Sequence, residues 1–349
     1  MSQNKIRIGI SSGDINGIGL EVIIKTFLDP RMLDFCTPIL YCSSKVASYH
    51  RKVLGINDFS FNLITDADNA NSKRANIINC WDEEVKIELG YSTKIGGIYA
   101  LKSLECALKD LKENKIDALV TAPIDKYNIQ SEAFNFPGHT DYLSQQFSGG
   151  KDYLMLMTSE TLKIGLVTTH IPLVKISEYI TKELILSKLE ILNKTLVQDF
   201  NIRRPKIAIL GLNPHAGDNG VLGNEENEII SPAIKEANDK GYVVFGPYPA
   251  DGFFGSLNYT KFDGVLAMYH DQGLVPFKTI AFGTGVNYTA GLPIIRTSPD
   301  HGTAFEIAGK NLANESSFRE AIYLACDIHK NRMQYNILKE NSLKGIENE

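Results

Sequence analysis

Three short apolar segments of this sequence each run into a histidine, and this repeated pattern limits the fold more than any other feature. Apolar runs of five to seven residues suit strands buried on both faces of a parallel sheet, although a buried helix segment has the same composition. In such sheets the chemistry is carried by side chains just past the carboxyl ends of the strands. The pattern therefore predicts an α/β fold with functional groups at three strand ends. The segments and their histidines are 264–268 with His270, 162–168 with His170, and 206–212 with His215.

These histidines are candidates for metal ligands. The chain has 7 histidines in all, so three at strand ends are a large share of them. Imidazole is the commonest nitrogen ligand of divalent metals, and three protein ligands with an open position are typical of catalytic sites. Each histidine taken alone could equally be a loop residue bonded to backbone. The three together, with Asp271 beside one of them, predict a divalent metal site if the strand ends meet within one subunit or between two.

Composition indicates an ordinary globular protein. A length of 349 residues suits two domains or one large α/β unit, and the 43% hydrophobic and 22% charged content is ordinary. A net charge of -5 does not favour binding to nucleic acid or to an anionic membrane. No apolar run reaches membrane-spanning length. The 5 cysteines show no paired spacing, which argues against a disulfide framework or zinc knuckle. We therefore expect a cytoplasmic protein that binds neither nucleic acid nor membrane.

A glycine-rich turn at residues 11–19 joins the first predicted strand, 6–10, to a helix at 20–28. Free backbone N–H groups at such a helix start could bind a phosphate. The glycine spacing matches neither the dinucleotide fingerprint nor a P-loop. A tight turn that needs positive φ is therefore an equally good interpretation.

Other local patterns predict further elements. Glycines 96 and 97 precede a long amphipathic helix at 98–114, and segments 153–157 and 162–168 form a hairpin that adds an antiparallel element to the sheet. The acidic cluster from Glu225 to Glu228 is explained by the dipole of the helix it starts, so we assign it no metal role.

The motif PGHTD predicts another helix start. Thr140 is a natural N-cap, and His139 beside it could contact an anion held at the helix N-terminus. Capping alone is the alternative explanation for the motif.

Charged residues around the histidines indicate the kind of substrate. A metal near Asp251 and Asp271, with Lys278 and Arg296 further along the chain, describes a small anion held by cations over a Lewis acid. The two cations could instead be surface residues with buried stems. Arg296 ends an apolar run, so we expect its head at a sheet edge. Hydrolysis, aldol cleavage and hydride transfer all fit these residues.

Eight sequence blocks in one order, covering nearly the whole chain, resemble the 4-hydroxythreonine-4-phosphate dehydrogenase family of pyridoxal phosphate biosynthesis. The final block also resembles the nucleotide-binding loop of isocitrate and isopropylmalate dehydrogenases. This resemblance implies two α/β/α domains with a cleft between them: residues 1–130 plus 300–349 with the nucleotide-binding loop, and residues 131–299 with the metal ligands and dimer interface. The blocks are SGDINGIGLE, TAPIDK, PGHTD, VTTHIPL, GLNPHAGDNG, GPYPADGFF, MYHDQGLVPFK and VNYTAGLPIIRTSPDHGTAFEIAGK.

The resemblance also assigns residues. The family's metal ligands come from two chains, which implies an obligatory homodimer with a shared active site. This sequence departs from the commoner family pattern at Ile15, Asn16, Leu20, Asp125 and Gly252, none of which is a metal or substrate group. By position, the metal ligands are His170, His215 and His270; the substrate residues are His139, Thr140, Lys278, Asn287 and Arg296; and the nucleotide-loop residues are His301, Gly302, Thr303 and Ala304.

The activity implied is oxidation and decarboxylation of 4-phosphohydroxy-L-threonine to 3-amino-2-oxopropyl phosphate, with NAD or NADP and one zinc, magnesium or cobalt ion. Asp251, Asp271 and Lys278 are the catalytic candidates, with one of the two aspartates expected to act as the base. Alternatives of the same fold are dehydrogenases of threonate or erythronate 4-phosphate or of a ring dihydrodiol. From another class, a metallohydrolase or a non-catalytic ligand sensor stays open.

Overall fold

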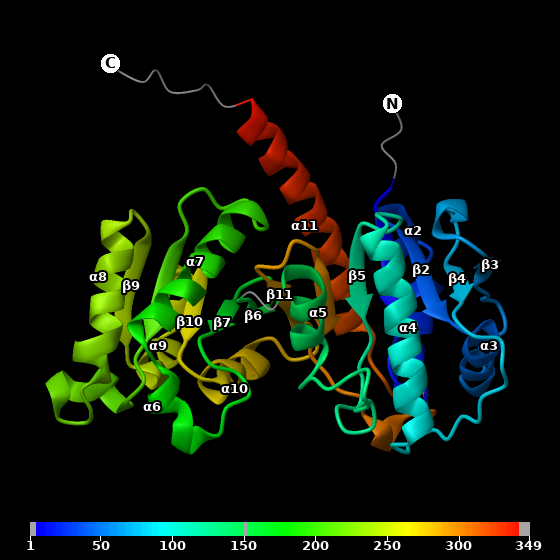
Figure 1. Ribbon diagram of the computed structural model, residues 1–349, viewed down its shortest axis with the longest axis horizontal. Coiled ribbons are helices and arrows are strands. Elements are labelled where there is room, and N and C mark those ends of the chain that lie inside the picture. Colours follow the sequence, from blue (N-terminus) through cyan, green and yellow to red (C-terminus); the bar gives the residue numbers. More distant parts are fainter. Residues whose placement is uncertain (1–4, 150–151, 342–349) are drawn as a thin grey trace.

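A computed structural model describes residues 5–149 and 152–341, and within them one mixed sheet of twelve strands runs through the molecule (Figure 1). The strand order is β3-β4-β2-β1-β5-β12-β11-β6-β7-β10-β8-β9. The strands are β1 (Arg7–Ser11), β2 (Thr37–Cys42), β3 (Asn62–Ile64), β4 (Asn76–Asn79), β5 (Ala118–Thr121), β6 (Leu154–Thr158), β7 (Lys163–Leu166), β8 (Lys206–Leu210), β9 (Val243–Tyr248), β10 (Gly264–Ala267), β11 (Val286–Ala290) and β12 (Arg296–Pro299).

Strand direction changes in the middle of the sheet. The pairs β12–β11, β11–β6 and β6–β7 are antiparallel, and every other pair is parallel. The predicted hairpin is therefore confirmed as β6–β7. The strands that precede the three histidines, β7, β10 and β8, are adjacent and parallel, so their carboxyl ends lie at one edge.

Helices cover both faces of the sheet and bury separate apolar clusters. On one face α1, α3, α7, α8 and α11 pack on a single large cluster. On the other face α4 and α5 cover one cluster, and α9 and α10 cover another. The helices are α1 (Gly19–Leu28), α2 (Met32–Phe35), α3 (Ser44–Val53), α4 (Lys94–Lys112), α5 (His139–Ser148), α6 (Ile176–Tyr179), α7 (Lys182–Gln198), α8 (Ser231–Asp239), α9 (Ala250–Gly255), α10 (His270–Ile280) and α11 (Ser316–Glu340).

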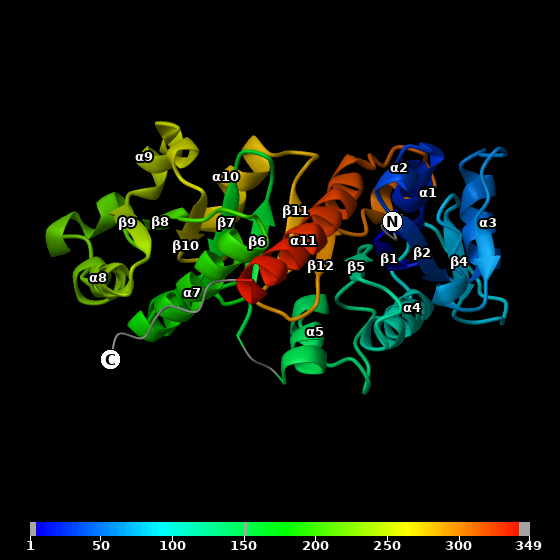
Figure 2. The ribbon, with the colours of Figure 1, turned by 90° about the horizontal axis from the view of Figure 1, so that it is seen from above.

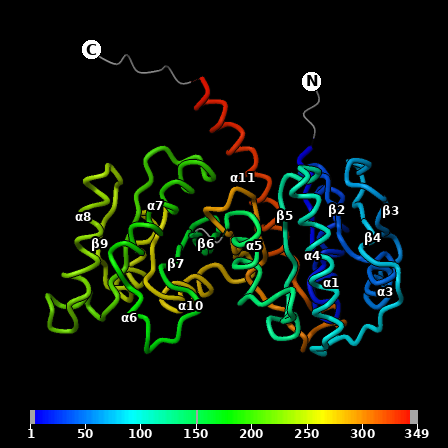
Figure 3. The backbone as a smooth tube through the Cα atoms, viewed as in Figure 1, coloured from blue at the N-terminus to red at the C-terminus, as the bar shows by residue number. Residues whose placement is uncertain are grey.

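The chain crosses from one end of the sheet to the other and then returns to the middle. Figure 3 shows the blue to teal strands β1–β5 at one end, the green to yellow strands β6–β10 at the other, and the orange and red segment returning to the middle. The sheet continues without a break through the predicted domain boundaries, so the division into two domains stays a prediction. Among the described residues, no helix is long and apolar enough to cross a membrane.

Helix α4 begins earlier than predicted, at Lys94, and contains both glycines in its first turn. Thr93 caps it by accepting a hydrogen bond from the Gly96 amide. A Cβ at Gly97 would lie 2.1 Å from the Asn128 carbonyl oxygen, and one at Gly96 would meet the Asp14 carboxylate. The two glycines therefore belong to the helix, and their lack of a side chain lets Asp14 and Asn128 pack closely against its first turn.

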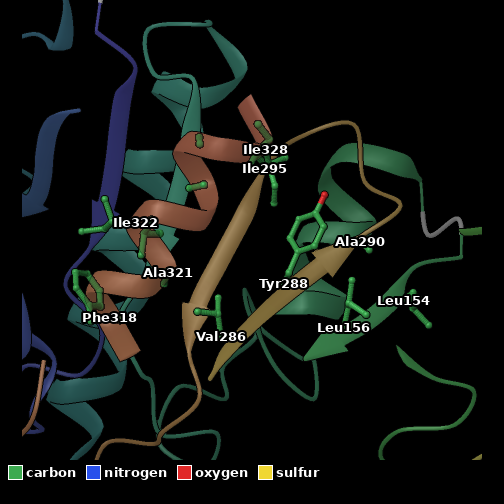
Figure 4. Packing of buried hydrophobic residues seen from close by; sticks show 14 of the residues in the cluster. Leu154, Leu156, Val286, Tyr288, Ala290, Ile295, Phe318, Ala321, Ile322 and Ile328 are labelled. Atoms are coloured by element: carbon green, nitrogen blue, oxygen red, sulfur yellow. The ribbon is translucent and has the colours of Figure 1, made fainter. Parts of the chain in front are cut away.

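Helix α11 crosses the middle of the sheet between α1 and α7, as Figure 2 shows. Figure 4 shows Phe318, Ala321 and Ile322 on this helix and Val286 and Tyr288 on β11, and the helix packs against β12, β5 and β11. All five side chains are buried. This packing holds the central strands in place.

A buried polar network fastens the same helix. Tyr288 Oη donates to Asp199 Oδ2 at 2.5 Å, Arg332 Nε donates to Asp199 Oδ1 at 2.7 Å, and Arg332 Nη2 donates to Tyr288 Oη at 2.9 Å. Asp199 is only 3% exposed. The network therefore joins the end of α7, strand β11 and helix α11.

Replacing Arg332 with methionine is expected to lower the free energy of unfolding by about 3–5 kcal/mol, because it leaves the Asp199 charge buried without a cation. Urea unfolding at neutral pH measures the change. Arg319→Met on the same helix is the matched control, since its i,i+4 ion pair with Glu315 is partly exposed and contributes less than about 1 kcal/mol. Equal losses in the two variants would show that the network has no special role.

Candidate active site

A cavity of about 190 Å³ lies over the middle of the sheet, beside the start of α5. Tyr288 in β11 faces the large apolar cluster. Because successive residues of a strand face opposite sides of the sheet, its neighbours in the strand face away from that cluster. This places Asn287 and Thr289 on the face that carries α5. Among the cavity-lining residues are seven predicted from the sequence: His139, Thr140, His170, Asn287, Arg296, His301 and Gly302.

Arg296 is the main charged group of this cavity. It is 3% exposed, and its guanidinium donates to Thr121 Oγ1 at 2.6 and 3.1 Å and to Thr289 Oγ1 at 3.1 Å. Burial lowers its pKa to about 9, and no neighbouring carboxylate opposes this effect among the described residues. A buried cation that is bonded only to hydroxyls is suited to bind an anion.

The expected position of Arg296 at a sheet edge or on the surface is wrong. Its backbone pairs with Leu119 inside the sheet. The apolar run before it is therefore not a strand that ends at Arg296. Instead, β12 begins there.

The start of α5 also differs from the prediction. The helix begins at His139 after Gly138, and no side chain caps it. Thr140 is not the N-cap, and its Oγ1 lies 3.4 Å from Thr289 Oγ1, across the cavity lining. This threonine is thus oriented toward the sheet instead of toward its own helix.

Several polar atoms around the cavity are buried without a hydrogen-bond partner. They include His139 Nε2, Asn287 Oδ1 and His301 Nε2. Burial, and then the charges of Arg296 and Lys126, hold the pKa of His139 well below its usual value, so this imidazole is neutral near pH 7. Buried polar groups are nearly always paired, so these atoms point to a polar ligand.

Two of the three predicted metal ligands lie close together. The rings of His170, which follows β7, and His270, which opens α10, have centroids 6.2 Å apart. His270 Nδ1 lies 2.6 Å from Asp271 Oδ1. A carboxylate bonded to one ring nitrogen leaves Nε2 for a metal, so Asp271 is well placed to orient this ligand.

The loop that carries His215 is shaped by a buried glutamate. Glu226 accepts hydrogen bonds from the amides of Leu212 and Asn213, each at 2.7 Å, and is 2% exposed. His215 itself has φ 54°. Sequence reasoning attributed the acidic cluster to a helix dipole and missed this role, because the bonds join segments more than ten residues apart.

No group of three or more histidine, cysteine, aspartate or glutamate side chains within the described part of one chain is placed to hold a metal. The kinds of donor present nevertheless fit a divalent metal ion. The imidazoles of His170 and His270 are neighbours, and the Asp271 carboxylate already orients His270. His215 lies on the loop after β8, the strand adjacent to β10. These residues could hold a divalent ion together with ligands from a second subunit.

The three catalytic candidates do not line the cavity of their own chain. Lys278 is half-exposed on α10, and its ammonium lies 3.5 Å from Asp300. Burial raises the pKa of Asp300, and the Lys278 charge opposes this. Asp251 is exposed on α9, and Asp271 is 77% exposed.

The predicted nucleotide loop rests on the glycine-rich turn. The Ile18 amide donates to the Thr303 carbonyl at 3.0 Å, and a Cβ at Gly17 would lie 2.9 Å from that oxygen. Ala304, the last loop residue, has φ 43°. The turn therefore supports the loop that includes His301 and Gly302, and Gly17 allows the close approach.

The same turn is tied to α3 by a buried histidine. His50, on α3, is 3% exposed, and its Nε2 lies 2.8 Å from the Ile15 carbonyl oxygen. Burial lowers the pKa of His50 to about 4. The ring is therefore neutral and donates to this carbonyl.

We expect this histidine to make stability depend on pH. The unfolded chain binds a proton at a pKa near 6.5 and the folded chain only near 4, so stability is full above about pH 6.5 and falls by up to about 3 kcal/mol toward pH 4. Urea midpoints at pH 7.5 and 5 measure the change. His50→Gln keeps a donor but does not titrate, and an unchanged pH dependence in that variant would contradict the assignment.

Two charged residues of the cavity, Lys126 and Asp141, were not predicted from the sequence. Lys126, after β5, lines it, and its Nζ lies 3.4 Å from His170 Nε2. Its position in the polar loop after a predicted strand was the available signal. Thr121 and Ser298 also line the cavity and were not predicted.

Comparison with known proteins agrees with this fold. The family described as "Pyridoxal phosphate biosynthetic protein PdxA" matches residues 34–325. The chain is 55% identical over 344 residues to 4-hydroxythreonine-4-phosphate dehydrogenase of Bacteroides thetaiotaomicron, covering 99% of this chain and 94% of the relative. It is similar to the crystal structure of the same-named enzyme of Klebsiella pneumoniae, with TM-score 0.78, 32% identity and coverage of 93% and 100%.

A more distant likeness concerns the fold alone. Isocitrate dehydrogenase of Methylococcus capsulatus aligns with TM-score 0.51 and 12% identity over 96% of this chain and 89% of that one. The predicted isocitrate dehydrogenase-like α/β fold is thus confirmed. Because the family match and the 55% identical relative both span most of the sequence, the chain belongs to the PdxA family of pyridoxal phosphate biosynthetic proteins.

Proposed function

We propose that this protein oxidises and decarboxylates 4-phosphohydroxy-L-threonine to 3-amino-2-oxopropyl phosphate, with NAD or NADP and a divalent metal, in pyridoxine 5'-phosphate biosynthesis. Family membership supports a dehydrogenase, since relatives carry the name 4-hydroxythreonine-4-phosphate dehydrogenase. The observation that carries the proposal is the buried, carboxylate-free guanidinium of Arg296 among unpartnered polar atoms. The five free thiols support a cytoplasmic location.

The chain's own residues suggest how the substrate is bound. Arg296 supplies charge to one anionic end, and Asn287 and the neutral His139 supply hydrogen bonds. These groups are held by the sheet and by α5, so they are oriented before the substrate arrives. The burial of Arg296 also strengthens its attraction for an anion, because less water screens the charge.

His170, His215 and His270 would hold the metal, with Asp271 orienting His270. When bound, a zinc, magnesium or cobalt ion supplies a Lewis acid and the dinucleotide a hydride acceptor. His301, Gly302, Thr303 and Ala304 would contact the dinucleotide. Asp251, Asp271 and Lys278 stay the candidates for proton transfer.

Exposed apolar side chains support a site shared between two subunits. Each histidine loop is followed by large apolar residues that face solvent, and Phe282 near the end of this region is 89% exposed. Large exposed apolar side chains close in sequence to all three candidate metal ligands support an interface with another chain. A second subunit packed on these apolar residues would bring its Lys278, Asp251 and Asp271 toward the cavity of the first subunit. The other residues of the group are Leu173, Val174, Val221, Leu222 and Val275.

The experiment is an assay of purified protein with phosphohydroxythreonine, NAD or NADP and a series of divalent metals, followed by the absorbance of the reduced dinucleotide. We expect the highest kcat/KM for phosphohydroxythreonine. A higher value for threonate or erythronate 4-phosphate, or for a dihydrodiol, would assign the chain to that substrate. Absence of dinucleotide binding in calorimetry would favour the hydrolase or sensor alternative.

A further inference from the structure

Lys126 has a position that the proposed roles leave unexplained. It follows β5, lines the same cavity as Arg296, and places its Nζ 3.4 Å from His170 Nε2. Its backbone is fixed, because Gln130 Nε2 donates to the Lys126 carbonyl at 2.9 Å. The side chain is exposed, and its Cε is the nearest atom, at 3.6 Å, to where a Cβ on Gly138 would stand. The stem therefore lies beside the start of α5.

The charge of Lys126 has no carboxylate partner within ion-pair distance among the described residues. Its contact is with a ring nitrogen, which accepts a hydrogen bond only when it carries no proton. A divalent ion needs the same kind of lone pair. The ammonium and a metal therefore cannot both use His170 Nε2, and like charges a few ångströms apart also repel.

The cavity offers the displaced ammonium a place beside an anion. Lys126 and Arg296 both line it, and two cations suit a dianionic phosphoryl group better than one does. A lysine side chain has four rotatable bonds, so Nζ can move several ångströms while the backbone stays fixed.

We propose that Lys126 couples anion binding to metal binding: its ammonium either contacts His170 Nε2 or pairs, with Arg296, with the phosphoryl group of the substrate. An anion in the cavity thus draws Lys126 from the metal ligand and tightens metal binding, and the metal tightens anion binding by the same factor. This inference rests on the proposed function in two respects, the assignment of His170 as a metal ligand and the binding of an anionic group of the substrate beside Arg296.

The test measures binding rather than turnover. Co²⁺ affinity of the full-length protein is determined by equilibrium dialysis in sodium sulfate and in sodium chloride at equal ionic strength, with sulfate as the tetrahedral dianion. Lys126→Met preserves side-chain length and removes the charge. Lys235→Met, exposed on α8, removes an equal charge far from the cavity and is the matched control.

For the wild type and Lys235→Met, sulfate is expected to tighten Co²⁺ binding at least about fivefold. Lys126→Met should bind Co²⁺ more tightly than wild type in chloride and show almost no response to sulfate. Equal sulfate responses in Lys126→Met and wild type, or none in wild type, overturn the inference and leave the metal site standing. Failure of wild type to bind Co²⁺ in either salt overturns the proposed metal site together with the inference.

Discussion

Arg296→Met is expected to lower kcat/KM for the phosphorylated substrate by about 10²–10³-fold, the effect of about 3–4 kcal/mol of lost binding to a buried, hydrogen-bonded charge. The guanidinium is 3% exposed and bonded only to the hydroxyls of Thr121 and Thr289. An anion that loses this cation would keep only the exposed ammonium of Lys126 as a counter-charge in the cavity. Steady-state kinetics measured by dinucleotide reduction test this expectation.

The same substitution is expected to leave stability unchanged or to raise it. Burying a guanidinium without a carboxylate costs free energy, and methionine removes that cost while filling similar space. Thermal unfolding of the two proteins compares them. Arg74→Met, at an exposed position between β3 and β4, controls for net charge. If kcat/KM is unchanged, or if activity falls only as much as the protein unfolds, Arg296 does not bind the anion.

His215→Ala is expected to abolish metal binding and to reduce turnover more than about a hundredfold. Loss of a residue that only orients a metal ligand already lowers metal affinity or activity about 10–100-fold, and loss of the ligand itself should cost more. The loop itself should persist, because the Glu226 carboxylate holds its backbone amides and the imidazole takes no part in those bonds. Elemental analysis, turnover and thermal unfolding are measured together.

A second variant separates ligand loss from backbone strain. His215 has φ 54°, a conformation that asparagine adopts more readily than alanine. His215→Asn should therefore be as stable as wild type but still lack metal. His329→Ala, on α11, removes an imidazole outside the cavity and should keep both metal and activity. Near-normal dinucleotide reduction by the His215 variants would refute the ligand assignment.

The local sequence predicted those parts of the site that depend on a single strand and the loop after it. Buried apolar runs are read directly from residue order, and each of the runs before His170, His215 and His270 forms a strand. The β6–β7 hairpin was predictable for the same reason, since its two strands are separated by only four residues.

Errors arose where pairing partners are distant in the chain. Arg296 was expected at an edge, but pairing of β12 with β5 and β11 places it inside the sheet, opposite Leu119. Thr140 fits the N-cap pattern, yet its hydroxyl lies near Thr289, 149 residues away. Lys126 became a candidate only when the fold placed it against His170.

The sequence by itself thus determined the class of fold, the family and the identity of the histidine strand ends, because apolar periodicity and motif order are local properties of the chain. Only the tertiary structure decided which of those groups share one cavity and which charge is buried without a partner. Burial and the approach of charges depend on contacts between residues far apart in sequence, and these contacts set the electrostatics on which binding of an anion depends.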